Sequence, residues 1–487
     1  MPPTDESRAL LTDLYELSMA CGHWKLGTVL DATFHVTFRR LPFGGGFAVA
    51  CGLGPLLKDL EALRFSESDL AYLASLTGAD ERALFPAAFL DSLRDFRLTV
   101  DVDAVPEGTV AFAHEPLLRV SGPMIQAQLV ETLVLNALSF PTLVATKAAR
   151  VCLTAQGDPV IEFGLRRAQG PDGGLTASRA AYVGGCAATS NVLAGKRFGI
   201  PVKGTHAHSW VMAFDSEPVA FAGWAEAMPN NATFLVDTYD SLEGVRHAIE
   251  AGRKLRAAGH AFSAIRLDSG DLAWLSQEAR RLLDEAGFPE TKILASNELD
   301  ERVMESLKLQ GAAIDLWGVG THLVTAFEEP ALGCVYKLSA IRRPGGAWEP
   351  RVKLSEEREK TSVPGRLQTR RYAVDGEFAC DVIYDLSSPP GPQAVLVDPL
   401  DATRRRAVPE EATSEDLLVP VLRAGQRVYD APPLDASRER TSAQLGRFHS
   451  GIKRFLNPHR YPVGLEKSLF DRRTELVFQA RGRAPAD

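Results

Sequence analysis

One plan is repeated through the middle of this chain, and it constrains the fold more than any other feature. From about residue 160, a short apolar strand is followed by a polar or glycine-rich turn and an amphipathic helix, as in FSAIRLDSGDLAWLSQEARRLLDEAG. The polar turns begin about 22 to 31 residues apart, near Asp237, Asp268, Ser296 and Gly318. Strands and helices that alternate at this spacing predict parallel βα units.

Two earlier segments, PVIEFG and IPVKGTHAHS, fit the same plan and bring the candidate units to six or more. So many consecutive units favour a βα barrel over an open sheet. In both architectures the functional residues lie at the carboxyl ends of the strands. The polar turns fall at those ends, so binding and catalytic residues are expected there.

The segments on either side of these units have different patterns. Residues 1–140 combine helix-like spacing of apolar residues in LLTDLYELSMACGHW with strand-like alternation in ATFHVTF, which predicts a mixed α/β domain. Residues 336–487 contain strand-like runs between charged and proline-rich turns. We therefore expect an α/β protein with a βα-barrel domain over residues 141–335, followed by a β-rich region that packs back on the N-terminal domain.

Charge and cysteine content argue against several classes of protein. The chain has 54 basic and 62 acidic residues and a net charge of −8, which argues against nucleic acid as a partner but allows a local basic pocket. Its six cysteines are far apart and form no CxxC pair. We therefore expect free thiols in a reducing cytoplasm rather than a disulfide or zinc framework.

No segment predicts a membrane span or an export signal. The best candidate for a span, residues 129–145, is interrupted by Glu131, Asn136 and Pro141. The N-terminal MPPTDESRALLTD carries acids where a targeting peptide carries bases. We expect a cytoplasmic protein with no membrane partner.

The motif GTHAHSW follows the strand-like IPVK and contains His206 and His208, two residues apart. In an extended segment, side chains two apart share a face. With Thr205 and Ser209 beside them at a predicted strand end, a functional role is favoured over a structural one. Three roles are open to the histidines: metal ligand, general base, or phosphate acceptor through a ring nitrogen.

The motif RLDSGD closes another predicted strand. Asp268 and Asp271, three residues apart, suit Mg²⁺ or a ribose hydroxyl, although Asp271 is also well placed to cap the next helix. Arg266 lies among apolar residues in AIRLD. Its planar guanidinium matches a carboxylate or a phosphate.

Two further motifs favour a flat, anionic ligand. In GVGT, Gly318 and Gly320 let backbone N–H groups approach phosphate oxygens, and Thr321 adds a hydroxyl. In EFGLRRAQG, Phe163 can stack on a flat ring while Arg166 holds an anion. The residues by themselves predict phosphate chemistry in a βα barrel, without naming a substrate.

Several long motifs occur in a fixed order along the chain: LLTDLYELSMACGHW, FRRLPFGGGFAVACGL, FPTLVATKAAR, EFGLRRAQGPDGG, GTHAHSW, LVDTYDS, IRLDSGDL, GVGTHLVT, PALGCVYKL and LNPHRYPVGL. In these motifs the chain resembles the nicotinate phosphoribosyltransferases from end to end. The resemblance implies an irregular barrel of the type II phosphoribosyltransferase kind. It also implies conversion of nicotinate and phosphoribosyl pyrophosphate to nicotinate mononucleotide and pyrophosphate, coupled to ATP hydrolysis, as the first step of NAD salvage from nicotinic acid.

The same resemblance implies roles for individual residues. The catalytic residues would be His208, as a transient phosphohistidine, and Asp268. Nicotinate would be bound by Tyr15, Phe163, Thr205 and Arg266, with Tyr15 supplied by the neighbouring subunit of a homodimer whose active site lies at the interface. Phosphoribosyl pyrophosphate would be bound by Arg166, Asp237, Gly318, Gly320 and Thr321. Mg²⁺ would be bound by Asp268 and Asp271.

One loop bears on the choice between the acid and the amide substrate. The related amide-using enzyme carries an acidic residue near the position of Thr189, Ser190 and Asn191. Neutral residues there would not repel a carboxylate, so the loop favours nicotinate.

Two other functions compete with this interpretation. A histidine pair at a strand end is typical of metal-dependent barrel hydrolases, which need further histidines at other strand ends. His247 and His260 lie in or after a predicted helix, which leaves His322 as a candidate. The second competitor is a non-catalytic nucleotide-binding relative that kept the pocket.

Overall fold

The computed structural model describes residues 7–482, and these residues form two compact units. One unit consists of residues 144–330, and the other of residues 7–143 together with residues 331–482. The division into three domains, with boundaries after residues 140 and 335, stays a prediction of the sequence.

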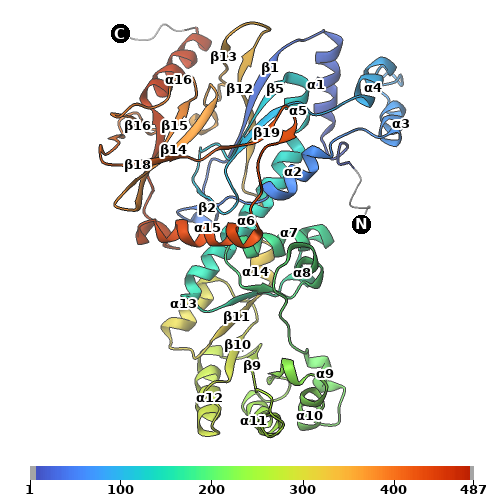
Figure 1. Cartoon of the computed structure of the whole chain (residues 1–487), viewed down its shortest axis with the longest axis vertical. Coiled ribbons are helices and arrows are strands. Elements are labelled where there is room, and N and C mark those ends of the chain that lie inside the picture. Colours follow the sequence, from blue (N-terminus) through green and yellow to red (C-terminus); the bar gives the residue numbers. More distant parts are fainter. Residues whose placement is uncertain (1–6, 483–487) are drawn as a thin grey trace. The chain divides into compact units, whose positions relative to one another are not determined.

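The unit of residues 144–330 is built on a parallel sheet with the strand order β7-β6-β11-β10-β9-β8 (Figure 1). Every neighbouring pair in this order is parallel. The strands are β6 (Val160–Glu162), β7 (Ala188–Thr189), β8 (Thr233–Leu235), β9 (Ala264–Leu267), β10 (Lys292–Ala295) and β11 (Leu316–Val319). The α/β class with parallel βα units, predicted from the spacing of the turns, is confirmed.

Helices connect the strands of this sheet. The α-helices are α7 (Gly170–Val183), α8 (Val192–Phe198), α9 (His208–Met212), α10 (Glu217–Ala227), α11 (Ser241–Ala257), α12 (Leu272–Glu285), α13 (Glu301–Leu309) and α14 (Thr321–Val324). Short 3-10 turns occur at η2 (Leu165–Arg167) and η3 (Pro229–Asn231). The unit begins inside the long helix α6 (Glu131–Ala155).

An aspartate precedes each of the helices α11, α12 and α13. Asp240, Asp271 and Asp300 accept hydrogen bonds from backbone N–H groups in the first turn of these helices. Such caps satisfy N–H groups that have no partner inside the helix, so they fix where each helix begins. Asp271 therefore has the capping role that was the alternative to metal binding, and its metal role stays a prediction.

The parallel sheet does not close into a continuous ladder within residues 7–482. β8 forms one edge, and beyond β7 at the other edge a single parallel bridge joins Thr189 to Val202. The chain after Val202 then reaches β8, where the ring of His206 accepts a hydrogen bond from the backbone N–H of Leu235 at 3.2 Å. The described residues therefore form an open parallel sheet rather than a closed barrel, and a side chain makes the contact at the open edge of β8.

A buried ion cluster holds α13 against α6 in the same unit. The carboxylate of Glu301 contacts Nζ of Lys147 and Nε of Arg150, each at 2.8 Å, and all three side chains are at most 1% exposed. Removing one partner of a buried ion pair typically costs about 3–5 kcal/mol, because the other charge is left uncompensated. Glu301 is therefore needed for the stability of this unit.

Strands from both ends of the chain share one sheet in the other unit. This antiparallel sheet has the order β13-β12-β1-β5-β3-β19-β20. Its strands are β1 (Asp31–Thr37), β3 (Asp101–Ala104), β5 (Leu118–Pro123), β12 (Val335–Arg342), β13 (Trp348–Pro350), β19 (Val419–Arg423) and β20 (Gln426–Arg427). Phe34 on β1 lies opposite Val120 on one side and Leu338 on the other, so the first strand of the chain is central to the sheet.

The same unit contains a mixed sheet with the order β17-β16-β21-β15-β14-β18 and a pair formed by β2 and β4. These strands are β2 (Ala48–Val49), β4 (Val110–Ala111), β14 (Leu367–Val374), β15 (Glu377–Asp385), β16 (Val395–Val397), β17 (Arg405–Ala407), β18 (Thr413–Asp416) and β21 (Val463–Glu466). The helical elements are η1 (Pro42–Gly44), α1 (Leu14–Lys25), α2 (Leu53–Glu61), α3 (Glu67–Ser75), α4 (Ala87–Arg94), α5 (Met124–Leu129), η4 (Arg358–Lys360), α15 (Leu434–Gly446), η5 (Ser450–Lys453) and α16 (Lys467–Ala480). Helix α5 packs against β1, β5 and α1.

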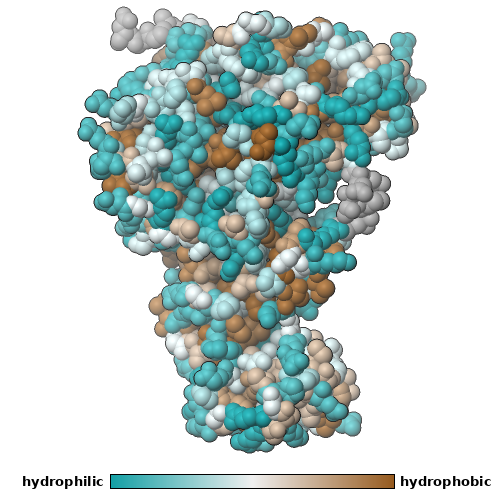
Figure 2. All heavy atoms as spheres, in the orientation of Figure 1, coloured by the Kyte–Doolittle hydropathy of each residue, from teal (hydrophilic) through white to brown (hydrophobic). Residues whose placement is uncertain are grey.

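The helical stretch Met124–Ala155, which comprises α5 and α6, is long and apolar enough to cross a membrane. Its most apolar window is 61% buried. Core helices of folded proteins have the same composition, so one such stretch is weak support for a membrane span. On the face drawn in Figure 2, apolar residues form separate groups among hydrophilic ones.

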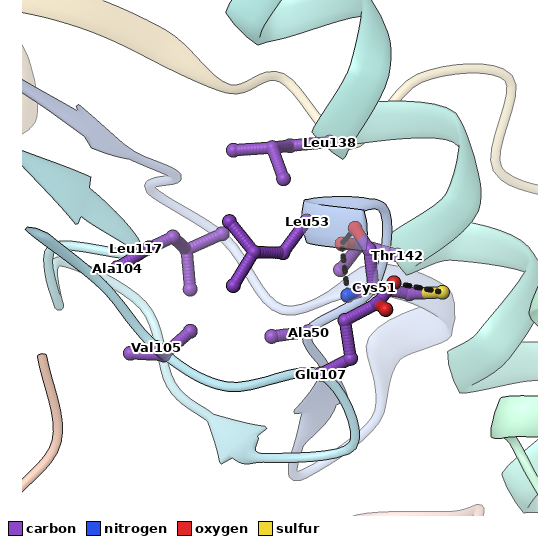
Figure 3. A pocket seen from close by; sticks show the side chains of 9 residues that line it. All are labelled: Ala50, Cys51, Leu53, Ala104, Val105, Glu107, Leu117, Leu138 and Thr142. Carbon is purple, nitrogen blue, oxygen red and sulfur yellow. Dashed lines mark hydrogen bonds between the residues drawn. The ribbon is translucent and has the colours of Figure 1, made fainter. Parts of the chain in front are cut away.

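A small cavity under α2 is closed by a buried carboxylate (Figure 3). Oε1 of Glu107 accepts a hydrogen bond from the backbone N–H of Gly52 at 2.7 Å, and Cys51 Sγ lies 3.7 Å from the same oxygen. The backbone N–H of Cys51 donates to Thr142 Oγ1 at 3.2 Å. The cavity admits no more than a water molecule, so these polar groups stabilise the start of α2 rather than bind a ligand.

Candidate active site

The polar turns after β8 and β9 are joined by hydrogen bonds. Asp237 follows β8, and its Oδ2 accepts hydrogen bonds from the backbone N–H of Asp268 at 2.9 Å and from Ser269 Oγ at 2.6 Å. The side chain of Asp237 is 1% exposed, and its Oδ1 accepts no hydrogen bond from the residues that the structure describes. The site therefore contains a buried carboxylate oxygen that is available to a ligand.

The guanidinium of Arg266 joins three segments at this edge of the sheet. It donates from Nε to Ser296 Oγ at 2.8 Å, from Nη1 to Thr205 Oγ1 at 3.2 Å and from Nη2 to Asp268 Oδ1 at 2.8 Å. Arginine has five N–H groups, so each terminal nitrogen retains one N–H after these bonds. Two parallel N–H groups held in this way suit a planar carboxylate.

His208 is the first residue of α9 and lies between the two carboxylates. Its Nδ1 is 3.1 Å from the hydroxyl of Thr238, and its Nε2 is 3.9 Å from Asp237 Oδ1 and 3.9 Å from Asp268 Oδ2. The side chain is 39% exposed. Nε2 is therefore the ring nitrogen that an incoming group can reach.

The other histidine of the motif, His206, is in a different environment. Its ring is buried, and its Nε2 accepts the hydrogen bond from Leu235 N–H while its Nδ1 lies 3.3 Å from the carbonyl oxygen of Ala207. Burial, together with the neighbouring charge of Arg266, lowers the pKa of His206 to about 4. His206 is thus a neutral side chain with both nitrogens in use.

The aromatic ring of Phe163 lies close to Arg266. The ring centroid is 5.6 Å from Cζ of Arg266, and the backbone N–H of Phe163 donates to Val319 O at 2.8 Å. A Cβ atom at Gly318 would lie 2.7 Å from the ring of Phe163, whereas one at Gly320 would make ordinary contacts. Gly318 is therefore needed so that the ring can pack against β11.

Other predicted site residues lie on the neighbouring turns. Thr321 begins α14, and its hydroxyl donates to Glu298 Oε1 at 3.4 Å. Arg166 is exposed on η2, after β6. Their contacts with a ligand stay a prediction.

Tyr15 belongs to the other compact unit, on α1. Its side chain is 48% exposed, and its hydroxyl donates to Glu131 Oε1 at 3.2 Å. Burial of the hydroxyl and the charge of Glu131 raise the pKa of Tyr15, so it stays protonated. Its contact with nicotinate stays a prediction.

A buried carboxylate behind Phe163 had no role in the sequence analysis. Glu162 accepts hydrogen bonds from Ser178 Oγ at 2.8 Å, from Thr189 Oγ1 at 2.5 Å and from the backbone N–H of Gly164. The amide of Asn191 donates to Ser178 Oγ at 3.1 Å. The loop of Thr189 and Asn191, which bears on the choice of substrate, is thus part of this network. In the sequence, the acidic residue within the apolar strand PVIEFG indicates such a network.

Ser296 is a second residue to which the sequence analysis gave no role beyond starting a polar turn. Its hydroxyl accepts from Arg266 Nε and donates to Asp268 Oδ1. It therefore fixes the arginine and the aspartate relative to each other. Its position at the end of the next strand was the available signal.

The histidine pair does not form a metal site of the hydrolase kind. His206 uses both ring nitrogens within the protein, and Nδ1 of His247 is bound to Glu217 at 2.8 Å. Nδ1 of His322 lies 3.2 Å from Asp300 Oδ2. No group of three or more histidine, cysteine or acidic side chains in the described part of the chain is arranged to hold a metal ion by itself.

The unit of residues 7–143 and 331–482 contains a small open cavity with a basic lining. Arg39, Lys337 and Lys360 supply its positive charges, against one acid, Glu359.

Family models for nicotinate phosphoribosyltransferase match three consecutive parts of the chain. The N-terminal domain model matches residues 10–139, the family model residues 159–363 and the C-terminal domain model residues 368–473. Together these matches cover most of the sequence.

Relatives from distant organisms align over nearly the full length. The chain is 39% identical to the nicotinate phosphoribosyltransferase of Bacillus subtilis, over 98% of this chain and 97% of that protein. It is 37% identical to the Bos taurus nicotinate phosphoribosyltransferase, over 95% of each chain. The crystal structure of human nicotinic acid phosphoribosyltransferase superposes with a TM-score of 0.82 and 33% identity, covering 96% of this chain and 99% of that one. The chain therefore belongs to the nicotinate phosphoribosyltransferase family.

Proposed function

We propose that the protein converts nicotinate, phosphoribosyl pyrophosphate, ATP and water to nicotinate mononucleotide, pyrophosphate, ADP and phosphate, the first step of NAD salvage from nicotinic acid. One observation carries the proposal. At a single edge of the parallel sheet, Asp268 accepts a hydrogen bond from the Arg266 guanidinium and lies 3.9 Å from Nε2 of His208, which is 3.9 Å from Asp237 as well. Membership in the family supports the same reaction.

Nicotinate would bind through Arg266 and the ring of Phe163. The two remaining N–H groups of the guanidinium suit the carboxylate. The hydroxyl of Thr205 accepts a hydrogen bond from Nη1 of the same guanidinium at 3.2 Å and helps to fix it. Phe163 would cover one face of the pyridine ring, and Tyr15 of a second subunit the other. The ring would then present its nitrogen to the ribosyl carbon, so that catalysis is largely positioning.

Phosphoribosyl pyrophosphate would bind along the neighbouring turns, through Arg166, Asp237, Gly318, Gly320 and Thr321. Departure of pyrophosphate gives the ribosyl carbon cationic character. The carboxylates of Asp237 and Asp268 can stabilise that charge because they are already fixed by hydrogen bonds.

ATP would phosphorylate His208. With a proton on Nδ1 directed at Thr238, Nε2 has a free lone pair, and it attacks the γ-phosphorus while the bond to ADP breaks. Water later hydrolyses the phosphohistidine to histidine and phosphate. The added group carries close to two negative charges, so phosphorylation changes the charge of the site before hydrolysis restores it.

Mg²⁺ is the proposed cofactor, and the residues present fit it. Oδ1 of Asp237 is a buried carboxylate oxygen without a protein donor, and Oδ2 of Asp268 lies at the same distance from Nε2 of His208, 3.9 Å. Mg²⁺ is usually held by one or two carboxylates together with substrate phosphates and water. When bound, it would neutralise phosphate charge. Asp271 is left out of this set because its Oδ1 caps α12.

We also propose a cytoplasmic homodimer with the active site at the interface. Exposed apolar residues follow one another along α1 and the turn before it: Leu11, Leu14, Tyr15 and Met19. Exposed apolar surface of this kind favours contact with a second subunit. Cys21, Cys152, Cys334 and Cys380 are free thiols, which suits a reducing compartment.

The test is an assay of mononucleotide formation with and without ATP, on wild type and on His208→Ala. We expect the variant to lose ATP stimulation and labelling by [γ-³²P]ATP. Retained ATP-stimulated turnover in the variant would refute the phosphohistidine. Absence of product with the wild-type protein would favour the non-catalytic alternative.

A further inference from the structure

We propose that His206 is a positioning residue for the reaction proposed above: its imidazole fastens the segment that carries Thr205 and His208 to the open edge of β8. The inference rests on the proposed function for its kinetic consequences. Its structural basis is independent of the substrate.

At the open edge of β8, the backbone N–H of Leu235 needs a hydrogen-bond acceptor. β8 pairs with β9 on one side, and Leu235 N–H, on the other side, donates to His206 Nε2 at 3.2 Å. An unpaired backbone N–H that is buried away from water is strongly unfavourable. His206 therefore supplies the bond that a further strand would supply in a closed ladder.

The segment itself has little other backbone support. Its last ladder contact is the bridge of Val202 with Thr189, and its next regular structure is α9, which begins at His208. Between these points, the carbonyl of Gly204 accepts a hydrogen bond from Asn231 Nδ2 at 3.3 Å. The ring of His206 thus links this segment to the edge strand β8, while Thr205 bonds to Arg266 on β9.

The ring is held in one tautomer and one orientation. Nε2 must be unprotonated to accept from Leu235, which puts the proton on Nδ1, 3.3 Å from the Ala207 carbonyl. Trp224 packs edge-on against the ring at 5.1 Å between centroids, and His206 is 5% exposed. Water cannot readily replace the imidazole as acceptor in so closed a site.

The two neighbours of His206 both reach the reacting groups. Thr205 Oγ1 donates to the His206 carbonyl at 3.0 Å and accepts from Arg266. His208 Nδ1 contacts Thr238, three residues beyond the end of β8. The segment is therefore held at the carboxyl end of β8 by two contacts, that of His206 with Leu235 and that of His208 with Thr238. Loss of the first link frees the imidazole of His208 to shift relative to the carboxylates. Misplacement by about 1 Å can cost a reaction about 100-fold in rate.

Two substitutions separate this role from simple packing. His206→Gln keeps an acceptor, the side-chain carbonyl, within reach of Leu235 N–H, whereas His206→Leu fills the space without one. Thr291→Val is the matched control. It removes one buried hydrogen bond, from Thr291 Oγ1 to the Phe262 carbonyl, just before β10 in the same sheet.

The experiment measures steady-state kinetics, the rate of His208 phosphorylation by [γ-³²P]ATP, thermal unfolding, and hydrogen exchange of the Leu235 amide. For His206→Leu we expect kcat and the phosphorylation rate to fall about tenfold or more with a smaller change in the KM for phosphoribosyl pyrophosphate, and Leu235 to exchange at least tenfold faster. His206→Gln should restore each quantity to within about threefold of wild type. Thr291→Val should lower the unfolding temperature without changing kcat.

The proposal is overturned if the Leu and Gln variants have equal kcat, or if Leu235 exchanges at the wild-type rate in the Leu variant. Hydrogen exchange does not depend on turnover. A wild-type protein without transferase activity would therefore overturn the proposed function, while the exchange data still decide whether His206 holds the segment.

Discussion

Oδ1 of Asp237 lies 3.9 Å from Nε2 of His208 and accepts no hydrogen bond from any residue that the structure describes. A phosphoryl group on Nε2 would meet the charge of this carboxylate at close range, and like charges at such a distance repel strongly when they are partly buried. The proposed phosphorylation of His208 would therefore require a cation between them.

The first prediction concerns the metal dependence of that step. Asp237→Asn removes one of the two carboxylate charges, and we expect the Mg²⁺ concentration for half-maximal phosphorylation to rise about tenfold or more. Asp271→Asn keeps a cap on α12, because asparagine caps helices as well as aspartate does, and should leave the Mg²⁺ dependence unchanged. A titration of both variants checks this. An unchanged Mg²⁺ requirement in Asp237→Asn would show that Asp237 is not a ligand.

The second prediction concerns recognition of the substrate carboxylate. Arg266→Lys cannot reproduce bonds to Thr205, Ser296 and Asp268 while presenting two parallel donors to nicotinate. We expect the KM for nicotinate to rise about 30- to 100-fold, which corresponds to about 2–3 kcal/mol. The KM for phosphoribosyl pyrophosphate should change much less. Equal increases in both constants would mean that Arg266 organises the whole site rather than the nicotinate pocket.

The third prediction tests why residue 318 is glycine. A methyl group in Gly318→Ala would lie 2.7 Å from the ring of Phe163, so the ring must move. We expect weaker nicotinate binding and a loss of about 1–3 kcal/mol in unfolding free energy, as for other overpacked sites. Gly173→Ala, inside α7, meets only the side chain of Gln169 at 3.8 Å and should be neutral or stabilising. Calorimetry and a nicotinate titration measure both effects.

The fourth prediction is a pH dependence of stability from His206. Its pKa is about 4 in the folded protein and near 6.5 when unfolded, so the unfolded state binds more protons between these values. The contribution of His206 to stability is therefore complete above about pH 6.5 and is lost as pH falls toward 4. Because the ring is not wholly shielded from water, we expect this loss to be about 2 kcal/mol.

Denaturant unfolding at pH 6.5 and 4.5 measures the effect. His206→Gln has no group that titrates at this position, so its stability should fall less than that of the wild type over this range. Thr291→Val should show the wild-type pH dependence. Parallel curves for wild type and His206→Gln would contradict the low pKa of the folded-state imidazole.

The parallel units and much of the site cluster follow from local sequence patterns. Apolar runs and aspartate caps define where strands end and helices begin, and the carboxyl ends of parallel strands share one edge. For this reason the sequence pattern alone groups Arg266, Asp268 and His208 at one edge of the sheet. The turns lie 22 to 31 residues apart, and this spacing indicates where one unit follows another along the chain.

Other contacts leave no such local pattern. An extended backbone would place His206 and His208 on one face, but α9 begins at His208, so the second ring turns toward Thr238 while the first covers β8. The pairing of Phe34 with Leu338 joins segments about 300 residues apart, and no short motif specifies it. Side-chain networks such as that of Glu162 depend on the tertiary fold in the same way.

The central position of β1 between β5 and β12 has a consequence for synthesis on the ribosome. The sheet that begins with the first strand of the chain cannot be completed until residues beyond 331 have emerged. Residues 144–330, which are continuous in sequence, can reach their compact state earlier. A truncation that removes the last third of the polypeptide would therefore leave β1 paired with β5 alone and expose its other edge. The expected result is aggregation of the nascent product rather than a modest loss of affinity.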